Sequence, residues 1–149
     1  MGGSWSFEIV ESASATPERV YAVLTDVAGW ARWAPGVKEA VLEQLGEPPP
    51  AGPGAVRKLG RAGFYIREKI LDAQPPRLQS YTLVSGLPVR DYRGTVELHP
   101  DGEATRIEWR ATFGVKIPGS GPVLRRVLVS TIGKTAAALA REAERGLPA

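Results

Sequence analysis

The sequence contains no cysteine and only one histidine, and both shortages exclude common kinds of site chemistry. Without cysteine there is no disulfide, no thiolate nucleophile and no zinc–thiolate site. The single histidine, His99, lies in the stretch His-Pro-Asp-Gly, which is typical of a solvent-facing turn. We therefore expect no metal site, no cofactor and no catalytic triad that depends on histidine.

Long apolar runs and clusters of one charge sign are also lacking. No stretch approaches the roughly 20 apolar residues of a membrane span, and the N-terminus shows no signal-peptide pattern. The 19 basic and 16 acidic residues give a formal charge of +3 and are interspersed. The densest basic group is predicted to lie on the solvent-exposed face of the last helix. It consists of Arg125, Arg126, Lys134 and Arg141. We expect a cytoplasmic protein without a nucleic-acid partner.

Proline and glycine are concentrated in one stretch, residues 46–54, with the sequence GEPPPAGPG. This composition predicts a loop, because it allows no regular element. We do not interpret it as an interdomain linker, since neither side is long enough to hold a separate core. With 149 residues, 43% of them apolar and 23% charged, one globular domain over residues 1–149 is expected.

The longest stretch without a strong break, Pro122 to Arg145, predicts a helix on the order of 35 Å long. Ser120 is expected to cap it, Pro122 suits its first turn, and Gly146 and Pro148 end it. Three- and four-residue steps place one set of side chains on its inner side. These residues are Leu124, Leu128, Thr131, Ile132, Thr135 and Leu139.

The rest of the chain is predicted to be mostly strands. Two short helices follow the first strand, one starting at Thr16-Pro17-Glu18 and one over Asp26 to Trp33. Hairpin-length connections make the sheet antiparallel, and only the final helix is long enough to cover one of its faces. The expected class is therefore α+β. The predicted strands are Trp5–Ala13, Val37–Leu45, Ala55–Arg61, Phe64–Asp72, Leu78–Val84, Val89–Leu98 and Ala104–Val115.

Three stretches resemble the polyketide cyclase/dehydrase and lipid-transport family of the START-like (SRPBCC) superfamily. They are TPERVYAVLTDVAGWARWAPGVKEA (Thr16 to Ala40), PPRLQSYTL (Pro75 to Leu83) and DYRGTVELHPDGEATRIEWRATF (Asp91 to Phe113). The resemblance implies the helix-grip fold, in which a curved sheet of about seven strands wraps a long C-terminal helix around a cavity. Members include polyketide aromatases and cyclases, lipid and quinone carriers and hormone-binding proteins, so the fold leaves the function open.

Within such a cavity, Glu68 is the candidate catalytic residue. It shares strand parity with Phe64, Ile66 and Ile70, so its carboxyl group is expected to face inward. Apolar surroundings would raise its pKa and suit it to general acid or base catalysis. Two other interpretations stay open: a bulge turns it outward, or an arginine pairs with it for structural reasons.

Arginines and tyrosines supply the expected polar contacts to a ligand. Arg57 shares parity with Leu59, and Arg90 with Tyr92, so either guanidinium could meet Glu68 or bind a carboxylate or phenolate. Both could equally reach outward at the rim. The hydroxyl groups of Tyr81 and Tyr92 would need a partner, which could be a ligand, water or another side chain.

The remaining candidates are aromatic and helical residues. Trp33, with Trp30, would lie near the cavity mouth or fill the core, and Trp109 would form a wall. Thr131 and Thr135 could reach a ligand or bond back to the helix backbone. The full ligand-binding set is Trp33, Arg57, Tyr81, Arg90, Tyr92, Trp109, Leu128, Thr131 and Thr135.

Two small-molecule functions remain, and action through a macromolecular partner is a third possibility. The first is binding of a hydrophobic small molecule, such as a polyketide, a quinone or a lipid, by a monomer or homodimer. The second is a cofactor-independent polyketide aromatase/cyclase or dehydratase. There Glu68 or a tyrosine would move protons while Arg57 or Arg90 stabilises an enolate. The lack of usable histidine and cysteine favours binding.

Overall fold

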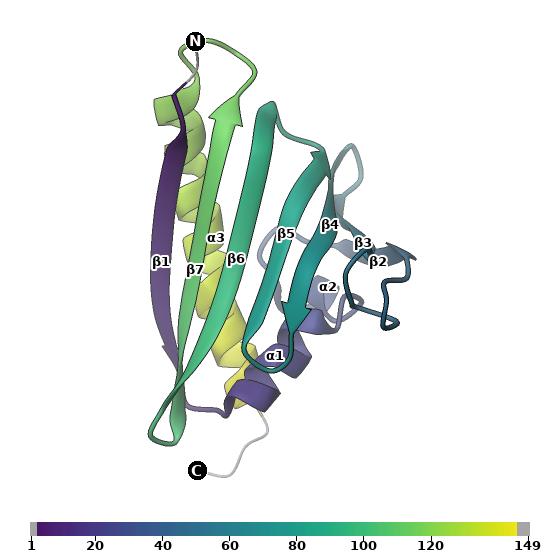
Figure 1. The fold of residues 1–149 in the computed structure, drawn as a ribbon, viewed down its shortest axis with the longest axis vertical. Coiled ribbons are helices and arrows are strands. Elements are labelled where there is room, and N and C mark those ends of the chain that lie inside the picture. Colours follow the sequence, from purple (N-terminus) through teal and green to yellow (C-terminus); the bar gives the residue numbers. More distant parts are fainter. Residues whose placement is uncertain (1–2, 146–149) are drawn as a thin grey trace.

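The structure is a computed structural model that describes residues 3–145. Seven strands form one antiparallel sheet in the order β1-β7-β6-β5-β4-β3-β2, so the first strand pairs with the last (Figure 1). The α+β helix-grip architecture is confirmed: a curved sheet, a long final helix and two short helices after the first strand. The elements are β1 (Trp5–Ala13), α1 (Pro17–Thr25), α2 (Trp30–Trp33), β2 (Glu39–Gln44), β3 (Val56–Arg61), β4 (Phe64–Gln74), β5 (Leu78–Ser85), β6 (Val89–Asp101), β7 (Ala104–Val115) and α3 (Gly121–Glu144).

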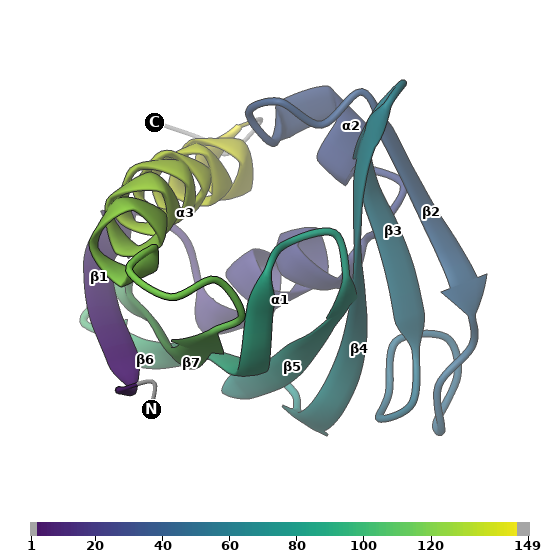
Figure 2. The ribbon, with the colours of Figure 1, turned by 90° about the horizontal axis from the view of Figure 1, so that it is seen from above.

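The sheet curls around one side of α3. Figure 2 shows β1 and β7 beneath this helix, while β2, β3 and β4 rise at the opposite end of the sheet near α2. The helix packs on β1 and β7 and also meets α1 and α2. Leu128 and Leu139 are buried, as predicted, and Ala136, Ala140 and Ala143 are fully buried beside them. These small side chains let the second half of α3 approach its neighbours closely.

β7 has the alternation that its sequence predicts. Ile107, Trp109 and Phe113 are buried on the inner face, whereas Arg106 and Arg110 lie on the outer face. Each inner side chain removes apolar surface from water, which is the main favourable contribution to folding. The core therefore follows the inner side of the sheet and ends at α3.

Two helix starts differ from the predictions. Helix α2 begins at Trp30 rather than Asp26, because Asp26 ends α1 and its backbone and side-chain oxygens accept bonds from the Gly29 amide. Ser120 does not cap α3, because its backbone is already helical and its hydroxyl donates to the Ile117 carbonyl at 2.6 Å. Within residues 3–145, no helix combines the length and apolar character needed to cross a membrane.

Candidate ligand-binding site

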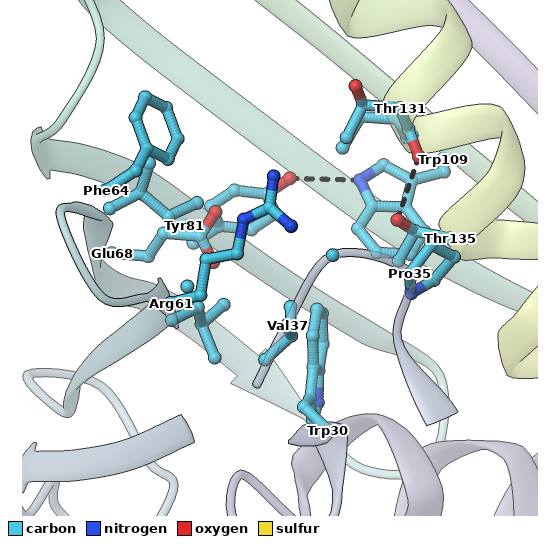
Figure 3. Close-up of a pocket in the computed structure, with 15 residues that line it drawn as sticks. Trp30, Pro35, Val37, Arg61, Phe64, Glu68, Tyr81, Trp109, Thr131 and Thr135 are labelled. Atoms are coloured by element: carbon cyan, nitrogen blue, oxygen red, sulfur yellow. Dashed lines mark hydrogen bonds between the residues drawn. The ribbon is translucent and has the colours of Figure 1, made fainter. Parts of the chain in front are cut away.

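A pocket of about 270 Å³ lies between the inner face of β3 and β4, the middle of α3 and the segment after α2. Figure 3 shows side chains from all of these elements converging on it. Its main apolar walls are Trp30, Leu59, Phe64, Ile66, Trp109 and Ile132. Its polar lining consists of Arg61, Glu68, Tyr81, Thr131 and Thr135.

Two tryptophans form a corner of the pocket. The rings of Trp30 and Trp109 stand edge to face, with centroids 6.5 Å apart and planes at 73°. The Trp30 indole is fixed by a hydrogen bond from its Nε1 to the Leu24 carbonyl at 2.9 Å. Rigid aromatic walls at this angle offer both a face and an edge to a planar guest.

Glu68 faces the pocket, as its strand parity predicts, and it is paired with a buried arginine. Arg57 lies opposite it in the β3–β4 ladder, and its Nε donates to Glu68 Oε1 at 2.8 Å. The Arg57 side chain is 1% exposed. The guanidinium carbon Cζ also lies 4.8 Å from the centroid of the Trp30 ring and 5.2 Å from that of the Tyr81 ring. Arg57 thus lies behind the lining and holds Glu68, so the surroundings of this carboxylate are not simply apolar.

Tyr81 lines the pocket and brings a hydroxyl group to it. Trp109 Nε1 donates to the Tyr81 oxygen at 3.0 Å, and the buried Tyr92 hydroxyl lies close enough to hydrogen-bond with the Tyr81 hydroxyl. Burial, followed by the nearby Glu68 carboxylate, raises the pKa of Tyr81. The ring needs a glycine opposite it, because a Cβ on Gly94 would lie 2.6 Å from the Tyr81 oxygen. Because its pKa is raised, the Tyr81 phenol keeps its proton and can act as a hydrogen-bond donor.

The two threonines of α3 behave differently. Thr135 is buried and donates to the Thr131 carbonyl at 2.8 Å, the backbone bond that helical threonines commonly make. Thr131 lies one turn earlier at the exposed edge of the pocket. Only Thr131 therefore keeps its hydroxyl available.

Arg90 does not meet Glu68, and the parity that placed it beside Tyr92 is wrong. The ladder between β6 and β7 shifts between Arg90 and Arg93, and Asp91 has a φ of 51°. This bulge adds a residue and turns Arg90 to the surface. Its Nε donates to the Val115 carbonyl at 3.1 Å, and Arg90 is absent from the pocket walls.

Three further expected residues lie outside the pocket lining. Tyr92 is buried behind Tyr81, with ring centroids 6.0 Å apart, and burial raises its pKa. Leu128 is buried where α3 meets the core. Trp33 is partly buried against Trp30, with centroids 4.9 Å apart, and thus supports the aromatic corner from behind.

Arg61 was missing from the expected site. It ends β3 at the edge of the pocket, and Figure 3 shows its guanidinium directed into the space. Among residues 3–145 it has neither a hydrogen-bond nor an ion-pair partner through its side chain. The signal was present in the sequence, since Arg57, Leu59 and Arg61 alternate along one strand and share a face.

His99 lies in β6 rather than in a turn, so the solvent-facing turn expected for it is wrong. The connection to β7 takes only two residues, and the strand therefore continues to Asp101. On the outer face, His99 Nε2 is 3.3 Å from Glu97 and 3.2 Å from Glu108, which brings metal-ligating atoms together. Arginines already pair with both carboxylates, and Arg106 holds the pKa of Glu108 below its ordinary value. The cluster is an outer ion-pair network, separate from the pocket.

The sequence matches the family model described as polyketide cyclase/dehydrase and lipid transport over residues 4–144. The chain belongs to this family. No curated protein sequence matches it significantly.

Solved structures share the fold of this family member. The Zhui aromatase/cyclase from a Streptomyces species aligns with a TM-score of 0.82 and 21% identity, covering 99% of this chain and 98% of the other. A START superfamily protein from Mycobacterium smegmatis aligns with a TM-score of 0.80 and 17% identity, covering 96% of this chain and 99% of the other. Norcoclaurine synthase from Thalictrum flavum, in complex with dopamine and hydroxybenzaldehyde, aligns with a TM-score of 0.77 and 15% identity. The alignment covers 99% of this chain and 91% of the other. At these identities the likeness establishes the fold alone.

Proposed function

We propose that the protein binds a compact, mostly apolar small molecule of one or two rings in the pocket beside α3. The observation that carries this proposal is the pocket itself, in which an aromatic corner and aliphatic walls surround a few polar groups. Small-molecule sites commonly have this composition, because burial of apolar surface drives binding while a few polar groups fix orientation.

The volume narrows the class of ligand. A dry cavity of about 150 Å³ holds one benzene molecule, and ligand pockets commonly begin at about 300 Å³. A space of about 270 Å³ therefore suits one or two rings. Of the expected ligands, a quinone-sized ring system fits, whereas an extended polyketide or lipid would leave part of its length outside. Norcoclaurine synthase, which shares the fold, is described with two single-ring aromatic ligands.

Tyr81 is the group that orients the guest. Its hydroxyl would donate to a carbonyl or hydroxyl oxygen of the ligand, while Trp109 Nε1, 3.0 Å from the phenol oxygen, keeps the phenol in place. A buried donor that gains an acceptor contributes about 1 kcal/mol, and leaving it unpaired costs more. The ligand is therefore an oxygen-bearing aromatic molecule rather than a pure hydrocarbon.

The alternative function is cofactor-independent acid–base catalysis, as in a polyketide cyclase or dehydratase. It is favoured by one observation, that Glu68 and Tyr81 line the same pocket. Glu68 would accept a proton while Arg57 holds its other oxygen, and Tyr81 would polarise the substrate carbonyl as a donor. Glu68→Gln should then retain ligand affinity and lose turnover; unchanged turnover would remove Glu68 from the reaction.

Binding is tested by filling the pocket. Calorimetric titration with naphthalene methanol, a neutral two-ring alcohol, should show one saturable site. Thr131→Trp places an indole on the pocket side of α3 and should weaken binding at least roughly tenfold by occupying the space. Ser130→Trp is the matched control, since Ser130 is exposed on the same helix and does not line this pocket. Absence of binding, or equal loss in both variants, would overturn the proposal.

A further inference from the structure

We propose that Arg61 makes the pocket selective for anionic ligands, so that the natural guest is a compact aromatic acid bearing a carboxylate or an acidic phenol. This inference rests on the proposed function and adds to it the charge of the ligand. It depends on three observations: the charge balance of the site, the unpaired state of Arg61, and the exposed apolar surface beside it.

The charge balance of the site is positive. Glu68 is the only carboxylate among the pocket-lining residues, and the buried Arg57 already pairs with it at 2.8 Å. The lining residues from α2, α3 and the segment after α2 carry no charge. Arg61 is thus a second guanidinium at this site and lines the pocket itself, and no lining carboxylate remains to balance it.

Arg61 is free to bind an anion. Its side chain forms no ion pair or hydrogen bond within residues 3–145, whereas Arg67 on the neighbouring strand is held by Glu43 at 2.8 Å. A guanidinium offers two parallel N–H donors that match a carboxylate, and its charge persists at every physiological pH. The geometry of Figure 3, with the guanidinium turned into the pocket, places those donors where a guest would lie.

The surface beside Arg61 matches the apolar part of such a guest. Phe64 is the ladder partner of Arg61 across the β3–β4 hairpin, and it is 57% exposed although it lines the pocket. A ligand with an aromatic body and an acidic end would cover this ring while its anion meets the guanidinium. Both features are then used by one molecule, which a neutral hydrocarbon or a cationic amine could not do.

The test compares three probes of nearly equal size: naphthalene carboxylate, naphthalene methanol and naphthalene methylammonium. At low ionic strength the wild-type protein should bind the carboxylate roughly tenfold tighter than the alcohol and the ammonium ion most weakly, because charge-assisted hydrogen bonds are the stronger kind. Added salt should reduce this preference, since the pocket mouth is open to solvent.

Matched variants locate the source of the preference. Arg61→Gln should bring the affinities for acid and alcohol to within about twofold, and Arg61→Glu should make the ammonium probe the tightest. Arg67→Gln removes the same charge from the outer face and should leave the order and ratios unchanged.

The outcomes separate this inference from the proposed function. If the alcohol binds in the pocket but the carboxylate binds no better, only the inference about charge is overturned. The same holds if Arg61→Gln and Arg67→Gln change the ratio equally. If none of the three probes binds, the proposed function fails and the ligand class fails with it. Thermal melting of each variant checks that the exposed substitutions leave the fold intact.

Discussion

The inner faces at the two ends of the sheet differ in polarity and in burial. Beside α1 and α3, the inner side chains of β6 and β7 are mostly apolar and buried, as with Val96 and Ile107, which are 0% exposed. At the other end, the inner faces of β3 and β4 carry Arg57, Arg61 and Glu68. One end is a packed core and the other is a charged, partly open wall.

The difference shows how the fold makes space for a guest. A helix laid over the whole sheet would leave a continuous core, because protein interiors pack to nearly crystalline density. Here α3 lies against β1 and β7, and the segment after α2 completes the far side (Figure 2). The pocket lies at the boundary between the two regions. Charges tolerated there need either a partner, as Glu68 has, or contact with solvent, as Arg61 has.

Removing the buried carboxylate should have the largest effect on stability. Glu68→Ala leaves the Arg57 guanidinium, 1% exposed, without its counter-ion, which should lower the free energy of unfolding by about 4 kcal/mol. Urea denaturation measures it. Glu43→Ala, which breaks an exposed ion pair, is the control and should cost less than about 1 kcal/mol. Equal losses would show that the open end is not a desolvated environment.

Truncating α3 at two positions compares the covered and open regions directly. Leu139 is 0% exposed within the packed region, and Leu139→Ala should cost about 3 kcal/mol because a new cavity remains. Ile132 is in the same helix, is half-buried and lines the pocket. Ile132→Ala therefore enlarges an existing space and creates no new cavity, so it should lower the free energy of unfolding by about 1 kcal/mol. Denaturation of both variants measures the difference, and a reversed order would contradict the comparison.

The smallest expected effect is the loss of stability at alkaline pH. Burial raises the pKa of Tyr81 and Tyr92, so the folded protein keeps protons that the unfolded chain releases above about pH 10. The unfolded state then binds fewer protons, and the free energy of unfolding must fall as pH rises through that range. Denaturation curves at several pH values should show this fall, and Tyr81→Phe should reduce its slope. Phenolate absorbance from all four tyrosines near pH 10 without unfolding would contradict it.

The sequence predicts the parts of the site that depend on local alternation. Glu68 follows Phe64 and Ile66 at two-residue steps, so its inward direction could be read directly, and the pairing with Arg57 was among the open alternatives. Arg90 could not be placed this way, because nothing in its local pattern announces the bulge at Asp91. A single extra residue reverses parity.

The convergence of Trp30, Tyr81 and Trp109 is also beyond local pattern. These residues come from a helix and two strands that are not adjacent in the sheet, and the sheet must curl before their rings meet. Arg61 differs, since the alternation that located Arg57 extends to it. Strand parity was a sufficient guide there, provided it is followed to the last residue of the strand.

The pairing of β1 with β7 has a consequence for how the molecule is made. Trp5 lies opposite Phe113, so the first strand emerges from the ribosome long before its neighbour exists. Until then β1 has an unpaired edge, and the shelter that α3 gives to the aromatic corner is missing as well. Biosynthesis must therefore proceed beyond β7 and through α3 before any guest can be enclosed, and contacts so distant in sequence slow the final closure.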